Sequence, residues 1–169
     1  MKQILIIFLL ILNINLPAQN CPTGNERVSS INQDFEKEVL RLTNKERKKR
    51  GLKKLKWNES LAYAARYHAK DMAVENYFEH HSYDRKSNSR LKEVCSTFDR
   101  IEAFVVFDYL AENISAGQVT PEEVVKSWMK SSGHRKNILN KQFTEIGIGY
   151  YRTDNSDYEY YWVQNFGGE

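Results

Sequence analysis

Apolar residues recur at helical spacing in the first half of the chain. Between about residues 30 and 50 they fall at i, i+4 and i+7, at Phe35, Val39 and Leu42. Ser30 and Gln33 resemble a capping box at the start of this helix. A second helix is expected after Asn58, because asparagine is a favourable N-cap and a stripe of mostly small residues follows. That stripe contains His68, which we interpret as a packed, hydrogen-bonded histidine rather than a ligand.

The middle of the chain is less regular. Residues 79–90 are polar and are expected to form a loop, with a short helix over about 88–94. Residues 101–110 are rich in Phe, Val and Tyr, which favours a strand or buried extended segment. A further helix is predicted by three consecutive start signals, which are an N-cap, a first-turn proline and a capping-box glutamate at Thr120, Pro121 and Glu123.

Two strands are predicted at the end of the chain. Ile146, Ile148 and Tyr150 alternate with Gly147 and Gly149, so one face is apolar and the other allows a close backbone approach. The aromatic segment 158–166 is expected to return antiparallel to it. Helices combined with such strands indicate an α+β domain built in layers.

The N-terminus resembles a secretory signal peptide. Lys2 is followed by a run of nine apolar residues, 4–12, which is too short to span a bilayer, and a cleavage site is expected after Ala18. The lipoprotein alternative is weaker because Asn20, which is not small, precedes Cys21. We therefore predict a signal peptide over 1–18, an extension over 19–29 and one domain over 30–169, without a transmembrane anchor.

Export to an oxidising compartment bears on the two cysteines, and the net charge bears on the kind of partner. Cys21 and Cys95 are the only pair, and an oxidising compartment favours a disulfide between them, the alternative being two free thiols. Without Lys2 the chain has 24 basic and 22 acidic residues, a net charge of +2 that argues against nucleic acid as the partner.

Basic residues nevertheless gather at the end of the first helix and beyond Gly51. They are Lys45, Arg47, Lys48, Lys49, Arg50, Lys53, Lys54 and Lys56. The ordinary interpretation is a solvated helix end, and the alternative is a polyanion-binding patch.

Local spacing alone predicts no chemistry, because the chain lacks HExxH, CxxC, a GxSxG elbow and a phosphate-binding glycine loop. Several separated segments nevertheless resemble, in order, the CAP superfamily of cysteine-rich secretory, antigen 5 and pathogenesis-related 1 proteins, in its bacterial form. These segments are Asn44–Arg47, Leu55–Asn58, Leu61–Met72, Tyr77–His80, Ala111–Ile114, Ser127–Leu139, Phe143–Gly149 and Tyr161–Gly167.

The resemblance implies a three-layer α-β-α sandwich with a central antiparallel sheet and an open cleft. It places His80, Glu112 and His134 in that cleft, where two imidazoles and a carboxylate suit Zn²⁺. His81 is the rival of His80, although the Phe-x-His register favours His80. Many eukaryotic relatives have a glutamate where this chain has Ser131, which leaves the fourth ligand without an equivalent. Glu123 and Glu145 are weaker substitutes, and a hydrogen-bonded polar network is the alternative to a metal site.

Three functions are compatible with this resemblance. The first is a secreted or periplasmic binding module for an extracellular lipid, protein or ion. The second is a metal-assisted hydrolase with Glu112 as the base. The third is a structural surface-interaction protein. The fold itself does not determine the ligand.

Overall fold

The computed structural model describes residues 21–86 and 88–169. The helices are α1 (Gln33–Lys48), α2 (Glu59–Val74), α3 (Thr97–Glu102), α4 (Pro121–Lys130) and α5 (Ser132–Ile138). The strands are β1 (Lys56–Trp57), β2 (Ser82–Arg85), β3 (Leu91–Cys95), β4 (Tyr109–Ala116), β5 (Glu145–Arg152) and β6 (Tyr160–Gly168).

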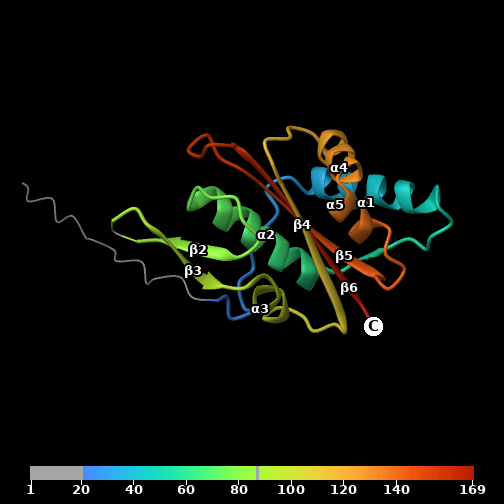
Figure 1. Cartoon of the computed structure of the whole chain (residues 1–169), viewed down its shortest axis with the longest axis horizontal. Helices are drawn as coiled ribbons and strands as arrows, with labels where there is room; N and C mark the ends of the chain where they lie inside the picture. The colour runs from blue at the N-terminus through green and yellow to red at the C-terminus, as the bar shows by residue number, and fades with distance from the viewer. Residues whose placement is uncertain (1–20, 87) are drawn as a thin grey trace, which may run out of the picture.

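The main sheet has the order β1-β5-β6-β4. Strands β4, β5 and β6 pair antiparallel, as predicted, while the short β1 adds a parallel pair at the edge. Helix α2 covers one face of this sheet, and α1, α4 and α5 lie on the other side (Figure 1). The result is the predicted α-β-α sandwich, and a separate β2-β3 hairpin lies beside α2 (Figure 1).

The predicted alternation in β5 explains how α2 packs on the sheet. Ile146, Ile148 and Tyr150 are buried in the core on the side of α1 and α4. On the opposite face, a Cβ on Gly147 would lie 2.1 Å from the Ala62 nitrogen, and one on Gly149 would lie 2.2 Å from the Ala65 carbonyl carbon. The two glycines therefore let the backbone of α2 approach the sheet.

Two of the predicted helix starts are confirmed and one is wrong. The Asn58 side chain accepts from the Leu61 amide, and Thr120 with Glu123 forms a complete capping box. The first helix begins later than predicted, because Asn32 rather than Ser30 is its N-cap and accepts from the Phe35 amide at 3.1 Å. The Ser30–Gln33 spacing resembles a capping box, but Asn32 is itself a favourable N-cap residue and lies directly before the helix.

The predictions for residues 79–110 are partly wrong. Residues 91–95 form strand β3 instead of a helix, because they pair with β2 across the hairpin. Residues 97–102 form α3, capped by the Ser96 side chain, and only the last two residues of the predicted strand 101–110 enter β4. The Ser96-x-x-Asp99 cap was the sequence signal that should have outweighed the apolar composition.

A disulfide joins Cys21 to Cys95, which confirms the predicted bridge and ties the N-terminal segment to the end of β3. The proposed signal peptide, 1–18, lies outside the described residues. Within the described part of the chain, no helix is both long and apolar enough to cross a membrane.

Candidate functional site

A buried carboxylate lies at the centre of the candidate site. The Glu112 side chain, on β4, is only 1 % exposed. His80 Nδ1 donates to Glu112 Oε1 at 2.9 Å, and Arg100 Nη2 donates to Glu112 Oε2 at 2.6 Å. Burial alone would raise the pKa of Glu112, but the adjacent Arg100 charge and the neighbouring histidines lower it to about 2. Glu112 is therefore an ionised, fully engaged carboxylate at neutral pH.

His80 is held at two points. It lies in the segment between α2 and β2, and its ring is 49 % exposed. Its backbone carbonyl accepts from Thr97 Oγ1 at 2.9 Å and from Arg100 Nη1 at 3.0 Å, both on α3. Arg100 thus fixes the backbone of His80 as well as the carboxylate that orients its ring. Because Nδ1 faces Glu112, Nε2 is the nitrogen that this arrangement presents to a ligand.

His134 is brought to the same region by α5. Asn113 Nδ2 donates to the His134 carbonyl at 3.2 Å, and Asn137 Nδ2 donates to Asn113 Oδ1 at 2.9 Å. These amides anchor α5 to β4 beside Glu112. Burial lowers the pKa of His134, and the charge of His80 lowers it further. Within the described residues the His134 ring forms no hydrogen bond to His80 or Glu112, although the charge of His80 acts on it.

His68, the buried histidine of α2, lies next to the Glu112 carboxylate. His68 is fully buried, and its Nε2 donates to the Glu79 carbonyl at 3.0 Å, which confirms its interpretation as a packed, hydrogen-bonded residue. The same nitrogen lies 4.0 Å from Glu112 Oε1. Burial lowers the pKa of His68 to about 3, so its ring is neutral.

The other candidates lie elsewhere or have other partners. His81 contacts Glu93 on the exposed hairpin at 2.9 Å. Glu123 is engaged at the start of α4, where its carboxylate accepts from the Val119 amide at 2.9 Å. Glu145 accepts from Asn58 Nδ2 at 2.6 Å, and Ser131 lies at the junction of α4 and α5. None of these side chains forms a hydrogen bond or ion pair with the Glu112 side chain.

Sequence reasoning missed Arg100 and the roles of two asparagines. Arg100 is fully buried, but an isolated arginine in an apolar segment carries no sequence signal. Asn113 and Asn137 both lie inside segments used for the family resemblance, and the structure shows that they join the parts of the site. The available signals were the asparagine directly after Glu112 and the one three residues after His134.

The residues present fit a metal only in part. Neutral imidazoles at His80 and His134 are suitable zinc donors, but both oxygens of Glu112 are already hydrogen-bonded. Among the described residues, no group of three or more His, Cys, Asp or Glu side chains is placed to hold a metal ion. Glu112 is thus better suited to orienting a metal-binding histidine than to binding a metal itself.

Comparisons with known proteins identify the class. The sequence model of the cysteine-rich secretory protein (CAP) family matches residues 40–166. The chain belongs to this family. YkwD of Bacillus subtilis, an uncharacterized protein, is 42 % identical over 153 residues, covering 90 % of this chain and 54 % of YkwD.

Two further relatives extend this picture. YlbC of Bacillus subtilis is described as an uncharacterized membrane protein. It is 37 % identical over 144 residues, which cover 85 % of this chain and 37 % of YlbC. The solved structure of an extracellular protein containing an SCP domain, from Bacillus anthracis, has a TM-score of 0.68 and 32 % identity, covering 82 % of this chain and 42 % of that one. The chain therefore spans about half or less of the length of these relatives.

Proposed function

We propose that this protein is an exported binding module whose ligand site is centred on His80 and His134. The observation that carries the proposal is the half-exposed His80 ring, fixed through Nδ1 by a carboxylate that is itself buried and paired with Arg100. Such a ring is preorganised to present one nitrogen outward. Export rests on the signal-peptide pattern of residues 1–18 and on the extracellular relative from Bacillus anthracis.

The proposed ligand includes a divalent cation, for which Zn²⁺ is the natural probe. His80 and His134 would supply two nitrogen donors, and Glu112 would orient the first of them. Two donors are fewer than the three or four protein ligands of well-formed zinc sites, so binding is expected to be weak. A further ligand, a small molecule or a lipid headgroup, would then complete the coordination.

The geometry favours binding over metal-assisted hydrolysis. A hydrolase of the kind considered above would use Glu112 as its general base. A general base works best with a pKa near the operating pH, whereas the pKa of Glu112 is about 2 and both oxygens are occupied. Glu112 is therefore poorly suited to accept a proton from water.

Titration calorimetry with Zn²⁺ tests the proposal. The protein beginning at Gln19 should bind Zn²⁺ weakly at about pH 7.5, and binding should largely disappear at about pH 5.5, because metal ligation requires neutral imidazole with an ordinary pKa near 6.5. His80→Ala and His134→Ala should each abolish binding. His81→Ala is the matched control and should leave it unchanged, because His81 contacts Glu93 instead.

Replacing Ser131 provides a second arm of the same experiment. Ser131→Glu should tighten Zn²⁺ binding if this position faces the two histidines, as the family resemblance implies. Zn²⁺ binding that persists unchanged in a folded His80→Ala/His134→Ala variant would show that the histidines belong to a structural network alone.

A further inference from the structure

A basic pocket lies away from the candidate site. It has a volume of about 580 Å³ and is formed where the end of α1, the segment leading into β1 and the start of β5 meet. Its lining includes the exposed lysines Lys53, Lys54, Lys56 and Lys141. Glu145 is the acidic residue in this lining, and its carboxylate accepts a hydrogen bond from Asn58. The pocket is therefore strongly positive, although the chain as a whole is nearly neutral.

The walls of this pocket are fixed by a buried arginine. Arg47 is 2 % exposed, and its guanidinium donates to the carbonyls of Lys53, Ile138, Asn140 and Phe143 at 2.8 to 3.2 Å. The Asn44 side chain also binds both the amide and the carbonyl of Leu55, at 2.7 and 3.0 Å. The solvated helix end predicted from the sequence is therefore wrong for Arg47, which joins three segments and adds a buried positive charge.

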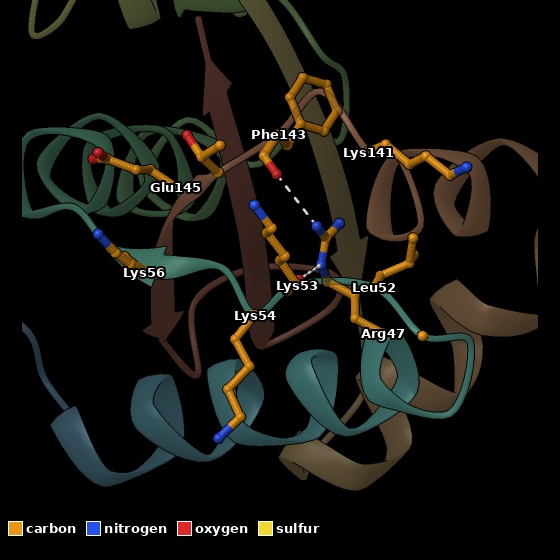
Figure 2. Close-up of a pocket in the computed structure, with 10 residues that line it drawn as sticks. Arg47, Leu52, Lys53, Lys54, Lys56, Lys141, Phe143 and Glu145 are labelled. Carbon is orange, nitrogen blue, oxygen red and sulfur yellow. Dashed lines mark hydrogen bonds between the residues drawn. The ribbon is translucent and has the colours of Figure 1, made fainter.

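The lysines differ from Arg47 because they are available to a ligand. In the described part of the chain, none of the four ammonium groups has a hydrogen bond or ion pair with another residue. Figure 2 shows Lys53 extending across the pocket, while Lys54, Lys56 and Lys141 point outward in different directions around its rim. Converging donors would suit a compact anion. Lysines that diverge around a rim suit an extended anion that carries several charges.

A second basic cavity adjoins the first. It has a volume of about 330 Å³ and shares Lys54 with the pocket. Its other basic residues lie along α1, at Lys37, Arg41, Lys45 and Lys48. Arg41 is paired with Glu38 at 2.5 Å, and the charge of Lys45 also acts on Glu38, but none of the three lysines forms an ion pair among the described residues. The positive surface thus continues from the pocket along the helix.

We propose that the pocket and the adjoining cavity bind a linear anion that carries repeated phosphate groups. The Lys ammonium is a compact point charge that binds phosphate without requiring a planar, two-point geometry. A hollow with fixed walls and a flexible basic rim fits a chain laid through it better than a flat membrane surface. This site is separate from His80 and His134, so the proposal does not depend on the proposed function.

Binding of medium-chain inorganic polyphosphate, followed by fluorescence anisotropy in low salt, tests this proposal. The triple variant Lys53→Gln/Lys54→Gln/Lys56→Gln should bind about tenfold more weakly, since each exposed ion pair contributes a modest amount. The dependence of its affinity on salt should also be shallower, because fewer counterions are released. All three side chains are exposed, so the variant should keep its fold, which circular dichroism verifies.

The matched control removes the same charge elsewhere. Lys70→Gln/Lys92→Gln/Lys136→Gln changes three exposed lysines outside both cavities and should alter affinity less than about twofold. Equal losses in the two triple variants, or no binding to the wild-type protein, would overturn the proposal. So would binding of monophosphate as tight as that of polyphosphate. Binding only to vesicles that contain phosphatidylglycerol would assign the surface to a membrane instead.

Discussion

Burial and neighbouring charges shift the pKa values of two carboxyl groups in opposite directions. Glu112 shows this, because Arg100 and His80 together keep its pKa near 2 despite complete burial. Asp71, on α2, shows the opposite balance. Tyr77 Oη donates to its carboxylate at 2.5 Å, yet burial raises the pKa of Asp71 to about 6. Glu112, with a pKa of about 2, and Asp71, with a pKa of about 6, are therefore expected to lose their protons at well separated pH values.

The first prediction follows from Asp71. Its pKa is higher in the folded protein, about 6, than the ordinary value of 3.8 expected in the unfolded chain. The stability associated with its protonated form is therefore fully present below about pH 3.8 and is lost as the pH rises to about 6. Relative to Asp71→Asn, the wild-type protein should lose on the order of 3 kcal/mol across this window, because one unit of pKa shift corresponds to about 1.4 kcal/mol.

Urea unfolding at a series of pH values measures this difference. Asp108→Asn is the control, because Asp108 is exposed and forms no hydrogen bond or ion pair with the described residues, and the stability of this variant relative to wild type should stay nearly constant over the same window. If the difference between Asp71→Asn and wild type were equally constant, the carboxyl group would not titrate as described.

At the level of secondary-structure elements, the contact between α2 and β5 determines how the layers fit. Gly149→Ala would place a methyl carbon only 2.2 Å from the Ala65 carbonyl carbon. We predict a loss of at least about 2 kcal/mol in the free energy of unfolding, because a backbone neighbour cannot move aside as a flexible side chain can. Thermal unfolding should show a clear decrease in Tm.

Gly133→Ala is the matched control for this substitution. Gly133 lies in α5, and a Cβ there would meet no atom within 4 Å. Alanine is the better helix former, so this variant should be unchanged or stabilised by up to about 1 kcal/mol. Similar stabilities for the two variants would contradict the close packing of α2 on β5.

Elements with complete local signals were predictable, and those formed by distant pairing were not. Thr120, Pro121 and Glu123 specify the start of α4 within four residues, and the Ile and Gly alternation specifies both faces of β5. Strand β3 depends on pairing with β2, so its short sequence was misread as a helix. Loop polarity over 79–90 likewise concealed β2.

The site was predictable only where a motif marked it. His80 and Glu112 come from segments separated by 32 residues, and the family resemblance rather than spacing brought them together. Arg100 belongs to no motif and could not be placed without the fold, although it contacts both of them. Arg47 was predicted to be solvated with the rest of its basic run. Its burial could not be predicted locally, because it depends on the carbonyls of Ile138 and Asn140, more than 90 positions away.

At the scale of the whole molecule, two separate surfaces have distinct chemistry. The His80 and His134 region lies around β4, α5 and the segment before β2, where the buried Glu112 carboxylate orients the His80 ring. The basic pocket lies where α1, β1 and β5 meet, and its charge comes from exposed lysines around walls that Arg47 holds together. The Cys21–Cys95 disulfide joins the N-terminal segment to the hairpin that follows His80, which adds covalent support near the first surface.

The most direct test of the proposed site is the protonation of the His80 ring, measured by long-range proton–nitrogen NMR at about pH 7.5, above the ordinary histidine pKa. Because Nδ1 faces the ionised Glu112, the account predicts that the His80 ring carries its proton on Nδ1 and leaves Nε2 free. Glu112→Ala should remove this preference and shift the ring toward the Nε2-protonated tautomer. A wild-type His80 protonated on Nε2, or a tautomer unchanged in a folded Glu112→Ala variant, would contradict the claim that Glu112 presents His80 to a ligand.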